Sequence, residues 1–193
     1  GPGGVLGNDY FDRKIGKVVN CVEDPKAKPV GGRGTARSIS RYQTNGIGDM
    51  LKEADPNSKV YSIGGKDRSA IFLAGQNPDL VLYYNNIDRF ISSTFYTDSL
   101  PDWVNQYNDN LNLKTYRDSV WDKILPDSFY LQYSREDYFD GEVDFYHDDE
   151  HDLSIDKSKK KNRYNPVFPI SFDEGVSPGK EFSDTPWFDE KLF

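Results

Sequence analysis

The stretch KVYSIGGKDRSAIFLAGQ, residues 59–76, decides the fold, because a short apolar run in it is followed by two glycines and then by a charged segment. Val60 and Ile63 favour a strand, and Gly64 and Gly65 then free the backbone to turn. We expect a buried strand that ends in an extended loop. The other elements of the chain are interpreted relative to this strand.

Two cations follow the glycines. Lys66 and Arg68 are two residues apart, so in an extended loop both side chains point to the same side. A lysine supplies a point charge and an arginine a flat fork of donors, and together they suit the oxygens of a phosphate or carboxylate. In open α/β folds, ligands bind beyond the carboxyl ends of strands, where this pair would lie. The alternative is a solvated loop in which Lys66, Asp67 and Arg68 form surface ion pairs, and composition alone favours that alternative.

The rest of the first 108 residues alternates between strand and helix signals. The expected elements are a hairpin within residues 1–24, a loop over 25–37, a helix at 40–54, a short helix at 69–74, strands at 80–84 and 90–96, and a helix at 101–107. Ser40 and Gln43 form a capping box for the first helix, and Gly46 and Gly48 allow it to pack closely on a sheet. This alternation predicts an α/β fold.

Beyond residue 108 the pattern weakens. SVWDKIL at 119–125 is interpreted as a short helix and FYLQY at 129–133 as a strand. Ten acidic residues stand against one arginine within 134–156, and five cations follow at 157–163. Adjacent blocks of opposite charge indicate a solvated insertion. The whole chain has a net charge of -8, which makes it a poor nucleic-acid binder. We interpret residues 109–180 as an irregular, acidic insertion or cap.

Two motifs in the acidic region resemble metal sites, and neither fits. His147 and His151 are four residues apart, but Asp148 stands where the glutamate of an HExxH zinc motif follows the first histidine. The acidic run around Gly141 departs from a calcium loop, because His147 falls where the bidentate glutamate belongs. A loosely bound divalent ion is left open, and no metal ligand is assigned in this chain.

The bulk composition indicates a folded but polar protein. Of the 193 residues, 36% are hydrophobic and 15% aromatic, and the mean hydropathy is -0.77. No apolar run is long enough to span a membrane, and no signal-peptide pattern is expected within this chain. The single cysteine, Cys21, excludes an internal disulfide and is interpreted as a buried strand residue.

Three segments, in order, resemble one enzyme family. GVLGNDYFDRKIGKVVNCVED, GGKDRSAIFLAGQNPDLVLYYN and TFYTDSLPDWVNQYN match its GN-[DE], KDR-then-AG and LP-x-WV motifs. The chain thus resembles the phosphate-irrepressible alkaline phosphatases of the type I phosphodiesterase/nucleotide pyrophosphatase group, within the alkaline phosphatase superfamily. The resemblance implies a partial alkaline-phosphatase-like sheet with flanking helices: residues 1–108 belong to the catalytic core, 109–180 form the cap, and 181–193 return to the core.

The resemblance also implies a mechanism. In this family two zinc ions activate a threonine that attacks phosphorus. Asn8, Lys66 and Arg68 match the residues that hold the non-bridging phosphoryl oxygens. Prepositioned donors lower the barrier to phosphoryl transfer, and a lysine and arginine pair favours a dianionic monoester. Without the resemblance, Asn8 would be interpreted as an ordinary turn residue.

The match to the family has gaps. The nucleophilic threonine is expected upstream of Gly1, the zinc ligands upstream of Gly1 and downstream of Phe193, and Gln76 replaces a histidine usual in the family. We therefore expect an inactive internal fragment of a periplasmic or secreted phosphatase that acts on a small-molecule phosphate ester. The alternative is a non-catalytic binding or structural module whose acidic insertion meets a cation or a basic partner.

Overall fold

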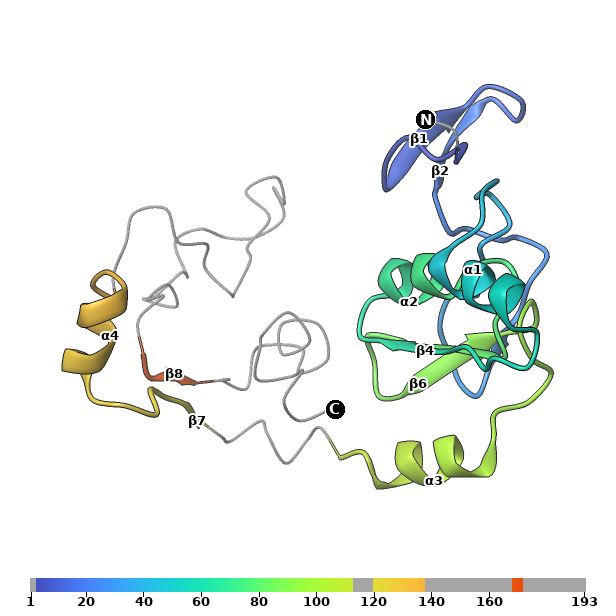
Figure 1. The fold of residues 1–193 in the computed structure, drawn as a ribbon. Helices are drawn as coiled ribbons and strands as arrows, with labels where there is room; N and C mark the ends of the chain where they lie inside the picture. The colour runs from blue at the N-terminus through green and yellow to red at the C-terminus, as the bar shows by residue number, and fades with distance from the viewer. Residues whose placement is uncertain (1–2, 113–119, 138–167, 172–193) are drawn as a thin grey trace, which may run out of the picture. The chain divides into compact units, whose positions relative to one another are not determined.

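The computed structural model describes residues 3–112, 120–137 and 168–171 (Figure 1). The chain divides into two compact units, Gly1–Leu111 and Asn112–Phe193, and each is described by itself. The division into a catalytic core, a cap and a return to the core assigns roles to segments, and it stays a prediction.

The first unit is built on a four-stranded mixed sheet. Its strand order is β3 (Pro29–Val30), β6 (Phe90–Ser93), β5 (Leu80–Tyr84) and β4 (Tyr61–Gly64). β4 runs parallel to β5, and the other neighbours are antiparallel. Every residue of β5 is buried, as its continuous apolar sequence requires. The strands predicted at 80–84 and 90–96 are confirmed, although the second ends earlier than predicted.

Three helices accompany this sheet. α2 (Asp67–Ala74) connects β4 to β5 and packs on both, which is the crossover that a parallel pair of strands requires. α1 (Ile47–Ala54) packs on α2, and α3 (Asp102–Asn110) lies on the opposite side of the sheet (Figure 1). The Asn108 side chain accepts from the Phe90 N–H and donates to the Phe90 carbonyl, both over 2.8 Å, which ties α3 to β6. The predicted α/β fold class is confirmed.

A hairpin of β1 (Asp9–Asp12) and β2 (Lys17–Asn20) begins the chain, as predicted. The Gly16 N–H donates to the Asp12 carbonyl over 2.8 Å, and Gly16 has a φ of 70°, which a side chain disfavours. Cys21 is buried, as predicted, but it lies in the turn directly after β2 and not in a strand.

One cluster of buried side chains joins the sheet, α2 and the segments that precede them. It consists of Cys21, Val22, Ile39, Ala70, Ile71, Ala74, Val81, Tyr83 and Ile91. Burying an aliphatic side chain of this kind contributes about 1.5–3 kcal/mol. The cluster therefore holds α2 against β5.

Glycines let α1 lie directly on the end of α2. A Cβ at Gly48 would collide with the carbonyl oxygen of Ala74, and a Cβ at Gly46 would lie 2.8 Å from the Gly75 Cα. The sequence predicted close packing through these glycines on a sheet. That partner is wrong, because the glycines face the last turn of a helix.

Asp49, rather than Ser40, caps the start of α1. The buried Asp49 carboxylate accepts hydrogen bonds from the N–H groups of Gly46, Gln76 and Asn77 over 2.8, 2.7 and 3.0 Å. One side chain thereby joins the start of α1 to the turn after α2. The predicted capping box at Ser40 is wrong, because the helix starts later in the chain.

We expect Asp49→Ala to lower the free energy of unfolding by about 3 kcal/mol, because three backbone N–H groups lose a charged acceptor. Urea denaturation followed by circular dichroism measures this loss. Asp55 is the matched control, since it is exposed and accepts one backbone N–H, that of Asn57, so Asp55→Ala should cost less than about 1 kcal/mol. Equal losses in the two variants would contradict the capping role.

The segment 59–76 differs from the prediction in two respects. Among the described strands β4 is an edge, and Tyr61 and Ile63 are 61% and 45% exposed, so it is not a buried strand. Lys66 directly precedes α2 and Arg68 lies in its first turn, so no extended loop separates strand and helix. The buried cluster favours this early helix, because it draws the apolar face of α2 onto the sheet.

The described part of the second unit is small. It contains β7 (Val120–Trp121) paired antiparallel with β8 (Ile170–Ser171), and α4 (Asp127–Tyr133) between them in the chain. The helix predicted at 119–125 and the strand predicted at 129–133 are both wrong, because periodicity over five to seven residues does not separate helix from strand. Among the described residues, every helix falls short of the length and apolar character that a membrane crossing needs.

Candidate functional site

A small hollow lies where β4 and β5 end and α2 begins. Its volume is about 170 Å³. Three cations, one carboxylate and several hydroxyl and amide groups line it: Arg37, Lys66, Arg68, Asp67, Thr35, Tyr83, Tyr84, Asn85 and Asn86, together with Ile91. This is the place, beyond the carboxyl ends of parallel strands, where the sequence predicted a ligand site.

The tight junction between β4 and α2 brings Lys66 and Arg68 to this hollow. A Cβ at Gly64 would lie 3.2 Å from the Ala70 Cβ, so glycine permits the close approach of strand and helix. The Ala70 N–H donates to the Lys66 carbonyl over 3.2 Å, which begins the helix. Both predicted cations thus lie at the positive end of α2, whose backbone dipoles add to their attraction for an anion.

Asp67 lies between two arginines. Its Oδ2 is 3.2 Å from Arg37 Nε, and its Oδ1 is 3.8 Å from Arg68 Nη1. Oδ1 also accepts a hydrogen bond from the Arg68 backbone N–H over 2.8 Å. Part of the predicted surface ion pairing therefore exists, but Arg37 is the nearer partner. Among the described residues, the exposed Lys66 ammonium has no ion-pair partner.

Arg37 is held by the two central strands. Its N–H donates to the Tyr83 hydroxyl over 3.0 Å, and the Ser93 hydroxyl donates to its carbonyl over 2.7 Å. Burial raises the pKa of Tyr83 to about 12, with the Arg37 N–H opposing this effect and the Asp67 charge adding to it. The Tyr83 hydroxyl therefore stays protonated and donates to the Thr35 carbonyl over 3.2 Å.

The turn between β5 and β6 forms one rim of the hollow. The Asn85 Oδ1 accepts from the N–H groups of Ile87, Asp88 and Arg89 over 2.9, 2.9 and 3.1 Å, so this side chain shapes the turn. Asn86 has a φ of 58°, a conformation that asparagine tolerates better than most residues. Within the described residues its amide has no hydrogen-bond partner, so it can donate into the hollow.

Asn8 is not among the residues that line the hollow. Its side chain is exposed, and its carbonyl accepts a hydrogen bond from the Cys21 N–H over 2.8 Å. Burial raises the pKa of the Cys21 thiol, and the charge of Arg68 opposes this rise. Cys21 also packs in the buried cluster with Ala70. The end of the hairpin that carries Asn8 is therefore anchored near the start of α2.

Gln76 has a structural role in this chain. Its Nε2 donates to the carbonyl oxygens of Tyr42 and Thr44 over 2.7 and 3.4 Å, and its N–H donates to Asp49. Gln76 therefore joins the turn after α2 to the loop before α1.

The described residues do not fit a zinc site. No group of three or more His, Cys, Asp or Glu side chains in residues 3–112, 120–137 and 168–171 is placed to hold a metal ion. His147, His151 and residues 138–156 of the acidic segment lie outside the described residues. We therefore derive no step through the zinc ions that the resemblance implies.

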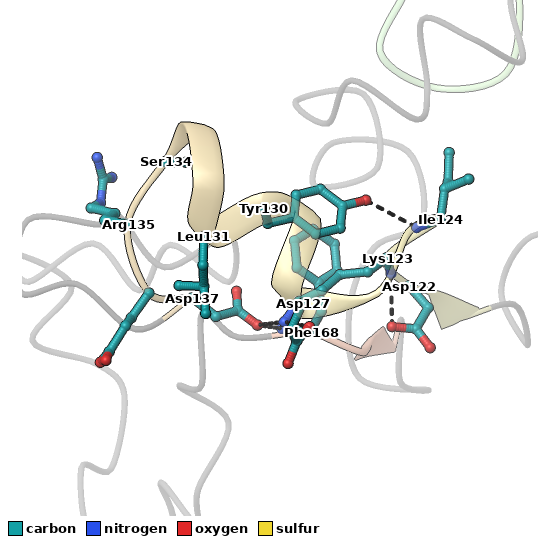
Figure 2. A pocket seen from close by; sticks show the side chains of 11 residues that line it. Asp122, Lys123, Ile124, Asp127, Tyr130, Leu131, Ser134, Arg135, Asp137 and Phe168 are labelled. Atoms are coloured by element: carbon teal, nitrogen blue, oxygen red, sulfur yellow. Dashed lines mark hydrogen bonds and ion pairs between the residues drawn. The ribbon is translucent and has the colours of Figure 1, made fainter.

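A second hollow, of about 620 Å³, lies in the second unit beside α4 (Figure 2). The Lys123 ammonium is 2.7 Å from Asp137 Oδ2 and 2.9 Å from Asp127 Oδ1, and these hydrogen bonds hold the pKa of Lys123 above its usual range. The Tyr130 hydroxyl accepts from the Ile124 N–H over 3.1 Å. Lys123 and two of the carboxylates of this hollow therefore pair with one another.

No family model matches the chain, but alkaline phosphatases are among the proteins that are similar to it. Alkaline phosphatase PafA of Elizabethkingia meningoseptica is 33% identical over an alignment of 140 residues, which covers 69% of this chain and 25% of that protein. Alkaline phosphatase PhoV of Synechococcus elongatus is 34% identical over an alignment of 133 residues, which covers 67% of this chain and 24% of that protein.

A crystal structure of alkaline phosphatase PafA matches 72% of this chain and 28% of its own, with a TM-score of 0.64 and 31% sequence identity. The chain has an alkaline phosphatase-like fold. It spans about a quarter of the length of the alkaline phosphatases that it matches. The crystallised PafA carries four substitutions, of a threonine, an asparagine, a lysine and an arginine in that order, with one residue between the lysine and the arginine.

Arg37 was not predicted from the sequence as a residue of the site. It lies in a loop rich in glycine and arginine, and composition alone predicted only a loop at 25–37. The pairing of Pro29–Val30 with β6 decides which cation of that loop lies beside α2. This is a long-range contact, and no local sequence pattern predicts it.

Proposed function

We propose that this chain supplies the phosphoryl-oxygen-binding residues of a zinc-dependent phosphate ester hydrolase, and that Asn8, Lys66 and Arg68 are those residues. The hollow at the start of α2 carries the proposal, because it gathers Lys66 and Arg68 beside a helix N-terminus. Support comes from the crystallised PafA, in which an asparagine, a lysine and an arginine of the same order were substituted together.

The charges of the hollow suit a dianionic phosphoryl group. In phosphoryl transfer the charge lies on peripheral oxygens, and donors that are already in place stabilise it. A monoester offers two negative charges to such donors and a diester one. We therefore propose a phosphomonoesterase of the type I phosphodiesterase/nucleotide pyrophosphatase group, periplasmic or secreted, with a small-molecule phosphate ester as substrate.

The threonine nucleophile and the zinc ligands are proposed to come from other segments of the full-length enzyme, so the 193-residue chain should bind phosphate without hydrolysing esters. The alternative of a non-catalytic module gains no support from the described part of the chain. A coding sequence with a threonine upstream and Asp/His ligand motifs on both sides would favour the enzyme.

Titration calorimetry of the purified chain with inorganic phosphate tests the proposal. Arg68→Ala should weaken binding about tenfold, since a charge-assisted hydrogen bond contributes roughly that factor. Arg89→Ala is the matched control, because Arg89 also pairs with the aspartate that precedes it, at 3.6 Å, and lies outside the hollow. Equal affinity of wild type and Arg68→Ala, or turnover of an aryl phosphate by the chain in the presence of a chelator, would overturn the proposal.

A further inference from the structure

We propose that Arg37 is a positioning residue that neutralises Asp67 and so leaves the charge of Arg68 available to a phosphoryl group. This inference rests on the proposed function and adds a residue to the same site. The site itself motivates it: Asp67 stands between Lys66 and Arg68 in the sequence, and its carboxylate lines the same hollow as these two cations.

An unneutralised carboxylate at this place would oppose phosphate binding in two ways. It would repel the phosphoryl oxygens, which carry the same sign of charge. It would also compete with phosphate for the guanidinium of Arg68, which lies 3.8 Å from Asp67 Oδ1. A phosphate site that contains Asp67 therefore needs a second cation for this carboxylate.

The distances assign that task to Arg37. Its Nε is 3.2 Å from Asp67 Oδ2, whereas the Arg68 Nη1 is 3.8 Å from Asp67 Oδ1. The other oxygen, Oδ1, already accepts the Arg68 backbone N–H over 2.8 Å. Both carboxylate oxygens thus have a partner without the Arg68 guanidinium, which can turn to a ligand at small cost.

The support of Arg37 is rigid. Its N–H is bound to the Tyr83 hydroxyl and its carbonyl to the Ser93 hydroxyl, so β5 and β6 hold its backbone on both sides. Its side chain and that of Asp67 are 22% and 17% exposed, which leaves the pair less screened than a surface ion pair. The guanidinium therefore stays on Asp67 whether or not phosphate is bound.

A double-mutant cycle with Arg37→Gln and Asp67→Asn tests this role, with inorganic phosphate as the probe and the 193-residue chain as the protein. If Arg37 acts by neutralising Asp67, Arg37→Gln should weaken phosphate binding about tenfold in the wild-type background and less than about threefold in the Asp67→Asn background. Arg37→Lys keeps the charge and should bind within about threefold of wild type. Asparagine at position 67 still accepts the Arg68 N–H, so the start of α2 is kept.

Arg41→Gln is the matched control. Arg41 also pairs with an aspartate at 3.2 Å, that of Asp12, with a side chain 16% exposed, and it lies outside the hollow. Its replacement should leave phosphate affinity unchanged. Melting temperatures of all variants, measured by circular dichroism, report any loss of folding.

The outcomes separate this inference from the proposed function. Phosphate binding that depends on Arg68 but is unaffected by Arg37→Gln overturns the inference alone. An equal loss in both backgrounds makes Arg37 a direct ligand and also overturns it. Arg37→Lys that binds as weakly as Arg37→Gln does the same. Phosphate binding that is absent, or independent of Arg68, overturns the proposed function and this inference with it.

Discussion

Replacing Arg68 by alanine in the full-length enzyme is expected to lower kcat/KM for a phosphate monoester about a hundredfold, the scale of losing one preorganised charge partner of the transition state. The physical reason is the position of Arg68 in the first turn of α2, on the hollow, where it pairs with Asp67 less closely than Arg37 does. Hydrolysis of a diester should fall less, because a diester presents one negative charge fewer. Steady-state kinetics with an aryl monoester and the matching diester measure the difference.

Arg89→Ala controls for the loss of an arginine that pairs with its preceding aspartate, and it should leave both rates within about threefold of wild type. An equal loss of monoester and diester hydrolysis in Arg68→Ala would show that Arg68 only clamps Asp67. A fall in melting temperature that accounts for the loss of activity would lead to the same conclusion.

The three helices described in the first unit, and its strands apart from β3, could be predicted because their signals are local, whereas β3 (Pro29–Val30) lies within the segment predicted as a loop at 25–37. The apolar run at 80–84 and the Gly16 turn each determine their element through short-range chemistry. The start of α1 could not be predicted in this way, because the cap is Asp49, which depends on the turn at Gln76. Ser40 has the right residue type for a cap but lies before a segment that does not continue as helix.

Two of the three cations of the site could be predicted, and the pairing of its carboxylate with the third, Arg37, could not. Lys66 and Arg68 stand out as neighbours in sequence, and the α2 start places them together, though through a helix rather than an extended loop. The pairing of Arg37 with Asp67 joins residues from distant parts of the chain. It exists because β3, β5 and β6 bring the loop of Arg37 to the end of β4.

The second unit shows the limit of short patterns. FYLQY in 129–133 has the aromatic content of a strand, yet it forms most of α4, which begins after Pro126. Proline fixes φ at a value that suits the start of a helix. Pro126 therefore indicated a helix, but the apolar content of the run that follows favoured a strand. The role of residues 109–180 as a cap stays a prediction.

Asn8→Ala in the full-length enzyme is expected to lower monoester kcat/KM about a hundredfold with little change in melting temperature. If the Asn8 amide donates to a phosphoryl oxygen, alanine removes a transition-state donor. The structure favours a small effect on stability, because the Asn8 side chain is exposed and has no hydrogen-bond partner among the described residues, while its carbonyl keeps the bond from Cys21. Kinetics and thermal denaturation of the same preparations measure the two effects.

Asn8→Asp distinguishes a phosphate contact from a turn residue. Aspartate keeps the shape of asparagine but places an anion against an anion, so the aspartate variant should turn over a monoester more slowly than the alanine variant. A turn residue predicts the opposite order, since aspartate is also favoured in turns and alanine is not. Asn57, an exposed turn asparagine away from the hollow, supplies the control pair Asn57→Ala and Asn57→Asp, neither of which should change turnover. Because the Asn8 side chain does not line the hollow, faster turnover by the aspartate variant would mean that Asn8 does not reach the phosphoryl group at all.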